Sequence, residues 1–294
     1  MSKHGQQQPQ KQSIGKSFRR FVKTPKGHVL GALILLTLVG SLYPQGHLGI
    51  RHAIAAGATA VMFDAIVAWA LKRKVAFSTG GLITGLIVAD VLSGLTPTYI
   101  IMLTTIAALV SKHILKRGRK PIFNPAAVGL LVSIGVFSTA ESWWAGMPIM
   151  PLWTLGLMLA VGVFVAVRVK KYLQVLTFLG TYFALILVMA LFHLGLPSAT
   201  PADALRTPFL NSALFLGFFM LTDPPTTPGT TNQQISFAAV SAAVAVALFA
   251  TVGGLTYLLI GLLAGNGLTA LMARSRKPVQ NVRPMERKTA SGAQ

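Results

Sequence analysis

Apolar residues gather along the chain into long runs that are separated by short polar junctions. The runs cover residues 28–43, 47–71, 80–93, 98–115, 124–140, 150–168, 172–193, 208–222, 234–251 and 253–272. A helix needs about 20 apolar residues, or about 17 at the short end, to cross a membrane core of roughly 30 Å. Most runs approach or exceed this length. The pattern therefore predicts an all-α polytopic membrane protein with about ten transmembrane helices.

Two runs are too short to cross a bilayer as plain helices. Residues 80–93 and 208–222 would rise only about 21–22 Å at about 1.5 Å per residue. Each is the third element of its set of five, and short Gly-interrupted segments at matching places indicate an internal repeat with broken helices. An odd number of spans per half inverts the second half. We therefore expect two inverted five-helix repeats, 28–140 and 150–272.

The distribution of charge orients these spans. The chain has 26 Lys and Arg but only six Asp and Glu. All but two of the basic residues lie in the tails or in three junctions, residues 72–74, 112–120 and 168–171. Because cytoplasmic loops are rich in Lys and Arg, both termini are expected in the cytoplasm of a bacterial inner membrane. Residues 1–27 are predicted to form a disordered basic arm and 273–294 a basic tail. The lipid bilayer, and not nucleic acid, then accounts for the net charge of +20.

Several kinds of chemistry are absent from the sequence. The chain has no cysteine, which excludes disulfides, thiolate metal sites and an iron–sulfur cluster held by this chain alone. The six histidines show no pairing at helical spacing, so no metal site and no catalytic residue is assigned. Redox chemistry would need a bound organic cofactor or a partner. Trp143, Trp144 and Trp153 flank an outer junction and are predicted to form an aromatic belt.

Three acidic residues lie at or near membrane depth, where ionisable groups are costly and often functional. Asp64 lies well inside a long span and is the leading candidate for ion coupling. Asp90 and Asp223 end the two short runs, Asp90 toward the outer surface and Asp223 toward the inner one. Each either caps the following turn or lines a cofactor or ion path.

Small and capping residues mark the same regions. Gly81 and Gly85 in the short third run permit close helix contact or an unwound backbone near a cofactor. Asn124 followed by Pro125 is a helix start, with Asn as N-cap. Capping alone is the simpler interpretation of Asn124, and a ligand role is the alternative.

Three segments together resemble one family of membrane proteins. They are STGGLITGLIVADVLS, KPIFNPAAVGLL and FFMLTDPPTTPGT, in this order along the chain. The family contains the D subunit of the Rnf electron-transport complex and the B subunit of sodium-pumping NADH:quinone reductase. The resemblance implies a ten-helix inverted repeat related to urea-transporter-like proteins. It also implies electron transport across the membrane through flavin, coupled in several members to Na⁺ or H⁺ movement.

The resemblance extends to a site for covalent FMN. Family members commonly attach FMN through a phosphoester to a Thr in a Ser/Thr-Gly-Ala-Thr motif, and the corresponding stretch here, GLPSATPADAL, places the acceptor at Thr200. Ser198 occupies the Gly position of that motif, and Gly admits backbone angles that Ser resists. The stretch is therefore either the FMN site or an ordinary Pro-bounded outer loop. A second, non-covalent flavin is an additional expectation. Asp90, Asp223, Gly81, Gly85 and Asn124 are further candidates for cofactor binding.

Two further functions stay open at this point. One is a urea-transporter-like solute channel or transporter, since broken helices around a midplane site would serve that equally well. The other is a cofactor-free membrane scaffold for a flavin-carrying partner. In the electron-transport interpretation, the expected partners are other subunits of the complex, an FMN-binding-domain protein and a flavin transferase.

Overall fold

A computed structural model describes residues 20–43, 46–73, 78–118, 120–144, 151–194, 205, 207–252, 254 and 256–275. The described chain is mostly helical and has a single short β-hairpin. The helices of the first half are α2 (Pro25–Gly40), α3 (Gly46–Ala70), α4 (Thr79–Val91), α5 (Thr98–Ile114) and α6 (Pro125–Phe137), with strands β1 (Lys116–Arg117) and β2 (Lys120–Pro121) between the last two. The second half contains α7 (Leu152–Arg168), α8 (Tyr172–Leu191), α9 (Thr207–Phe215), the π-helical turn η3 (Leu216–Met220), α10 (Thr231–Val252) and α11 (Tyr257–Ser275).

The composition of these helices is that of a membrane protein. Within the described residues, three helices are long and apolar enough to cross a bilayer: Leu48–Ala70, Tyr172–Leu191 and Thr231–Val252. The other apolar helices are shorter. Many large apolar side chains on these helices are exposed, such as Ile66, Val136 and Leu176. Exposed apolar side chains in this number suit contact with lipid tails better than contact with water. The expectation of an all-α membrane protein is thus confirmed.

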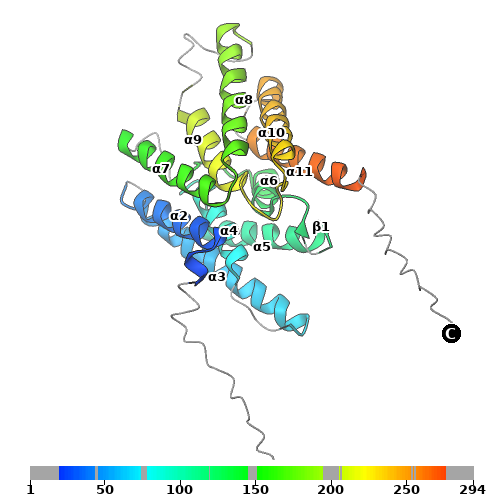
Figure 1. Cartoon of the computed structure of the whole chain (residues 1–294). Coiled ribbons are helices and arrows are strands. Elements are labelled where there is room, and N and C mark those ends of the chain that lie inside the picture. The colour runs from blue at the N-terminus through cyan, green and yellow to red at the C-terminus, as the bar shows by residue number, and fades with distance from the viewer. Residues whose placement is uncertain are drawn as a thin grey trace, which may run out of the picture.

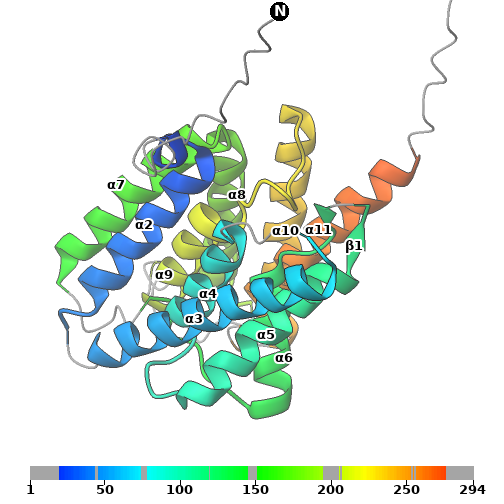
Figure 2. The same ribbon diagram turned by 90° about the horizontal axis from the view of Figure 1, so that it is seen from below.

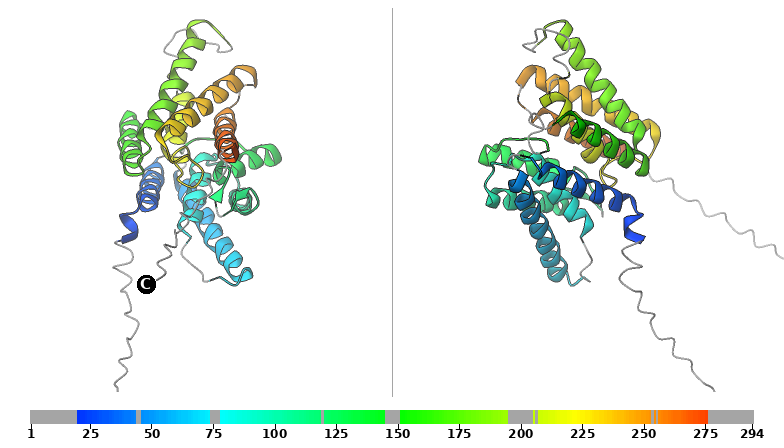
Figure 3. Two further views of the ribbon diagram at one scale, coloured as in Figure 1. Left: turned by 45° about the vertical axis from the view of Figure 1, so that its right-hand side comes forward. Right: turned by 90° about the vertical axis from the view of Figure 1, so that its left-hand side faces the viewer.

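The two halves lie against each other as two groups of helices (Figure 1; Figure 3, right). Within the first half, α2 packs on α4, α3 on α5, and α5 on α6. Within the second half the same pairings recur, with α7 on α9, α8 on α10, and α10 on α11. Between the halves, α2 runs beside α7 (Figure 2), and α6 packs on α11. The first of these contacts joins the first helices of the two halves, and the second joins the last helices.

The short third element of each half ends for a local reason. Helix α4 starts at Ser78, whose hydroxyl accepts a hydrogen bond from the Gly81 amide, and it ends where Leu92 turns extended. In the second half, α9 loosens into η3, in which the Leu221 amide donates to the Leu216 carbonyl at 2.8 Å. Pro224 and Pro225 follow soon after the end of η3, and proline cannot continue the hydrogen-bonding pattern of a helix.

The tryptophans of the outer junction do not all form a belt. Trp153 is 54% exposed, as expected, but Trp143 and Trp144 are buried, with exposures of 2% and 0%. Residues 138–144 fold back over the end of α4, where the Trp144 amide donates to the Asp90 carbonyl at 2.6 Å. The Trp144 indole donates to the Leu36 carbonyl of α2 at 2.7 Å. The aromatic-belt prediction is therefore wrong for these two residues, because the Trp144 ring packs on α2 and the Trp143 ring contacts Phe215 of α9.

Candidate functional site

A cavity of about 400 Å³ lies where several helix ends meet, and we call it the inner cavity. The lining comes from the starts of α2, α4 and α6, the last turn of α5, strand β2, and η3 with the segment that follows it. Its lining contains residues from all three segments that carry the family resemblance: Gly80, Ile83, Thr84 and Ile87; Lys120, Pro121, Asn124, Pro125 and Ala126; and Phe219, Thr222, Asp223, Pro224 and Pro225. Only three described lining residues, Lys26, Val29 and Lys112, come from elsewhere. Segments far apart in sequence thus build one site.

Asn124 holds two of these helix ends together. Its side-chain oxygen accepts from the Ala127 amide at 3.1 Å, which confirms the N-cap prediction. Its side-chain amide also donates to the Met220 carbonyl at the end of η3, at 3.0 Å. Asn266 of α11 completes the junction. Its side-chain oxygen accepts from the backbone amide of Asn124, and its side-chain amide donates to the Thr226 carbonyl. Asn124 therefore caps helix α6 of the first half and joins it to η3 of the second half.

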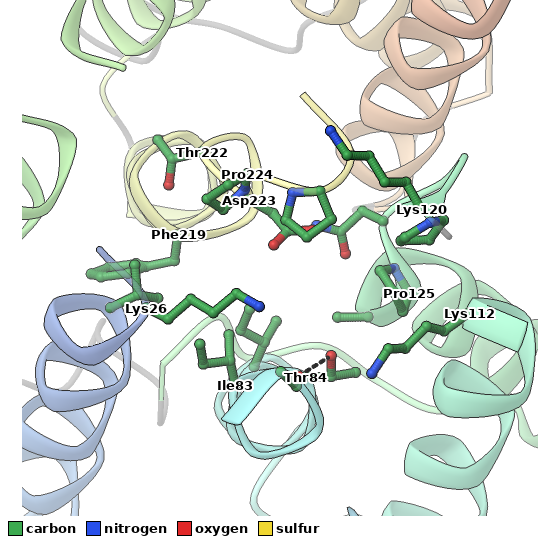
Figure 4. A pocket seen from close by; sticks show the side chains of 17 residues that line it. Lys26, Ile83, Thr84, Lys112, Lys120, Pro125, Phe219, Thr222, Asp223 and Pro224 are labelled. Carbon is green, nitrogen blue, oxygen red and sulfur yellow. Dashed lines mark hydrogen bonds between the residues drawn. The ribbon is translucent and has the colours of Figure 1, made fainter. Parts of the chain in front are cut away.

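Apolar and charged side chains together line the inner cavity, as Figure 4 shows for Phe219, Lys26 and Lys112. Val29, Ile87 and Phe219 are buried, with exposures of 5%, 3% and 1%. Lys26 and Lys112 extend into the space from opposite sides in Figure 4. The volume lies within the roughly 300–1,000 Å³ typical of small-molecule sites, which also combine apolar walls with a few polar groups.

Asp223 lines the cavity and also orders the turn that follows it. Its carboxylate accepts from the Thr226 hydroxyl at 3.1 Å, and its carbonyl accepts from the Thr227 hydroxyl at 2.9 Å. Burial raises the pKa of Asp223 to about 6, and the hydrogen bond from Thr226 lowers it in part. Both interpretations of Asp223, as a turn cap and as a polar group on a path, are thus compatible with its position.

Asp64 lies toward the C-terminal end of α3 and has partners there. Its carboxylate accepts a hydrogen bond from the Ser78 hydroxyl and lies 4.0 Å from the Lys112 ammonium group. Among the described residues, this is the only pair of Lys or Arg with an acidic side chain within that distance. The role of Asp64 in ion coupling stays a prediction, but its charge is balanced by an adjacent cation.

Gly81 and Gly85 face α3 and do not line the inner cavity, in which their neighbour Gly80 does take part. A Cβ atom at Gly81 would lie 2.7 Å from an Asp64 carboxylate oxygen, and one at Gly85 would lie 2.9 Å from the Ala56 carbonyl oxygen. The absence of side chains therefore permits close packing of α4 on α3. Their assignment to a cofactor stays a prediction, and the described contacts are those of helix packing.

Asp90 lies at the other end of α4, in a second and smaller cavity of about 150 Å³, which we call the outer cavity. Its side chain is not directed to the following turn. Instead, both carboxylate oxygens lie near the Thr37 hydroxyl of α2, at 3.0 and 3.2 Å. His52 of α3 lines the same cavity, is 2% exposed, and has no hydrogen-bond partner for Nδ1 among the described residues. The outer cavity therefore gathers buried polar groups with few partners.

Two predicted site residues lie outside the described part of the chain, and several residues that line the two cavities were not predicted as site residues. Thr200 and Ser198, the candidates for covalent FMN, lie outside the described residues. The sequence assigns Lys26 to the basic N-terminal arm and Lys112 and Lys120 to a cytoplasmic junction, and it gives Thr37 and His52 no role. The positive-inside pattern contained the lysines, but no local signal distinguishes lysines of a cavity from lysines of a loop. Groups of three or more potential metal ligands are absent from the described part of the chain.

Comparison of the chain with protein-family models and with curated proteins finds no match. The resemblance to the Rnf and sodium-pumping reductase subunits thus rests on the three segments themselves.

Proposed function

We propose that this chain is the membrane subunit of a flavin-dependent electron-transport complex, and that the inner cavity holds a non-covalent flavin. The observation that carries the proposal is the convergence of the three family-like segments on one cavity. Segments that resemble a flavin-dependent family, and that meet only in the tertiary structure, are best explained by a shared ligand.

The residues present fit such a ligand. The buried side chains of Val29, Ile87 and Phe219 offer apolar surface to a planar ring system, and Thr84 and Asn124 offer polar groups. When bound, a flavin would supply one- and two-electron redox chemistry, while the chain supplies position and excludes water. The chain cannot hold a cysteine-ligated iron–sulfur cluster, because it has no cysteine.

The architecture proposed with this function is two inverted repeats of five spans each, with both termini cytoplasmic. Two observations support it. Three helix pairings of the first half, α2–α4, α3–α5 and α5–α6, recur in the second, and elements of equal rank meet between the halves. Two junctions assigned to the cytoplasm also contact each other, since Lys171 donates to the Pro228 carbonyl. On the assigned outer side, the residue 138–144 junction covers the end of α4.

In this proposal Thr200, in an outer loop, carries a covalent FMN attached by a separate flavin transferase, and other subunits deliver and collect electrons. Coupling to Na⁺ or H⁺ would involve an intramembrane carboxylate. Asp64 is paired with Lys112, whereas Asp90 has no such cation among the described residues. Between the two, Asp90 is therefore the better-placed coupling group.

Purified protein tests the flavin assignment directly. Flavin released by denaturation should be stoichiometric in the wild type and lost in Thr84→Trp, because the larger side chain would fill the cavity. Val132→Trp is the matched control, since Val132 is 42% exposed on α6 and lies outside the cavity. Fluorescence of the protein band on a denaturing gel, absent in Thr200→Ala, tests the covalent site.

Wild-type protein that carries no flavin in either form would contradict the proposal. That result would favour the urea-transporter-like solute transporter or the cofactor-free scaffold.

A further inference from the structure

The outer cavity combines several hydroxyl groups with one buried carboxylate. Its described lining includes the side chains of Thr37, Ser41, Ser93 and Ser142 and that of Asp90. Asp90 is 6% exposed, and its described hydrogen-bond partner is the Thr37 hydroxyl. Lys and Arg side chains within 4.0 Å of Asp90 are absent from the described part of the chain. A carboxylate buried in this way can stay ionised only beside a cation.

The size and the donor atoms of the outer cavity define the class of cation. A volume of about 150 Å³ is small for an organic cofactor, but it has room for an ion with a few water molecules of roughly 30 Å³ each. Hydroxyl and carboxylate oxygens are ligands for hard cations, and one carboxylate balances one positive charge. Clusters of three or more His, Cys, Asp or Glu, as a transition metal would need, are absent from the described residues. The lining therefore suits a hard monovalent cation.

His52 of α3 separates this cavity from a second space, which we call the outer groove. The outer groove has a volume of about 480 Å³ and is lined by Leu48, Arg51, His52 and residues 94–99. Leu95 and Tyr99 in its lining are 71% and 61% exposed, so the groove lies at the surface of the chain. His52 and Gly94 line both spaces. The outer cavity thus lies behind His52 as seen from the groove.

The side chain of His52 provides a polar atom in this wall. It is 2% exposed, and its Nδ1 has no hydrogen-bond partner among the described residues. A buried polar atom without a partner is unusual, and the water carried by an ion would supply one. Arg51 is the one charged side chain among the described residues that line the groove, and it is exposed. Water and salt therefore screen its charge from an approaching cation.

We propose that the outer cavity binds a monovalent cation of the Na⁺ type, and that the cation enters it from the outer groove past His52. The inference deepens the coupling role proposed for Asp90. It rests on the sidedness given with the proposed function, in which the start of α3 faces outward, but not on the flavin.

Cysteine accessibility tests the route, because the chain has no cysteine of its own. Ala89 lines the outer cavity and is 6% exposed, so Ala89→Cys introduces one thiol there. Ag⁺, a monovalent cation that binds thiolates, is added in chloride-free buffer to right-side-out and inside-out membrane vesicles. Thiols that remain free are then labelled with a fluorescent maleimide after denaturation. Ag⁺ should block the thiol from the outer side alone, and Ser142→Cys repeats the measurement at a second position of the cavity.

Further variants in the Ala89→Cys background test the entry step and the occupant. His52→Phe should slow the reaction about tenfold, because an apolar ring offers the ion and its water no polar atom. His52→Gln, which keeps a polar atom, should react at nearly the original rate. His113→Phe is the matched control, since His113 lies outside both cavities and the groove. Na⁺ in place of choline should slow the reaction by occupying the site, and Asp90→Asn should remove this protection.

Reaction from the inner side, reaction from neither side, or an unchanged rate in His52→Phe would overturn the route. Absence of protection by Na⁺, or protection that survives Asp90→Asn, would overturn the cation site, and the cavity would then hold a protonated Asp90 and water. The flavin content of the same vesicles tests the proposed function separately. Flavin-free protein with the expected pattern of reactivity would contradict that function and leave the cation site in place.

Discussion

Helix α4 connects two cavities that differ in size, charge and closure. At its first turn lies the inner cavity of about 400 Å³, with three lysines and three helix starts. Near its last turn lies the outer cavity of about 150 Å³, with Asp90, His52 and the buried ring of Trp144. Helices α2 and α4 begin at the first cavity and end near the second, so their dipoles favour anions at the inner end and cations at the outer end.

The difference shows how one short helix can serve two sites. Because α4 has only 13 residues, its ends remain within the protein, and each end is covered by segments from elsewhere in the chain. At the inner end those segments bring lysines and prolines. At the outer end they bring residues 138–144, whose amides satisfy the last carbonyls of the helix.

The largest expected effect comes from opening the outer end. Trp144→Ala removes a fully buried ring and its hydrogen bond to Leu36, so it should destabilise the protein by about 3–5 kcal/mol. Trp153→Ala, at a side chain that is 54% exposed, should have a much smaller effect. Thermal unfolding in detergent measures both. Equal melting temperatures for the two variants would show that Trp144 does not close the outer cavity.

An intermediate effect is expected from the buried carboxylate of the outer cavity. Asp90 is buried and its described hydrogen-bond partner is the Thr37 hydroxyl, so it can hold a negative charge only when a cation lies beside it. Replacing choline chloride by NaCl at constant ionic strength should therefore raise the melting temperature of the wild type through preferential binding to the folded state. Asp90→Asn should abolish the rise, and Asp64→Asn should retain it. If Asp64→Asn alone abolishes it, coupling belongs to the inner end of α3.

The smallest effect concerns the one acidic group of the inner cavity. Burial raises the pKa of Asp223 to about 6, so its side chain is largely neutral at pH 5 and charged at pH 7.5. The charge opposes the binding of FMN, which is anionic, and Asp223→Asn should therefore raise FMN affinity by about threefold at pH 7.5 and leave it unchanged at pH 5. Ionisation of the FMN phosphate affects both proteins alike and cancels in their ratio. A ratio that does not vary with pH would place the FMN phosphate far from Asp223.

Some features of the fold could be read from local sequence because they depend on local physics. The N-cap role of Asn124 follows from its hydrogen bond to a backbone amide three residues on, and the early end of the eighth run follows from Pro224 and Pro225. The burial of Trp143 and Trp144 could not be read in this way. A tryptophan in an aromatic belt and a buried tryptophan can have the same neighbours in sequence. The two are distinguished by the fold of residues 138–144 over the end of α4.

Hydrophobic length and charge are properties of each segment, so the amino-acid sequence was sufficient to predict the helical elements and the membrane character. Which segments meet became evident in the folded chain. It brought three family-like segments to one cavity, paired Asp64 with Lys112, and gave Asp90 a hydroxyl in place of a cation. Such pairings depend on contacts between residues far apart in the chain, and no local pattern specifies them.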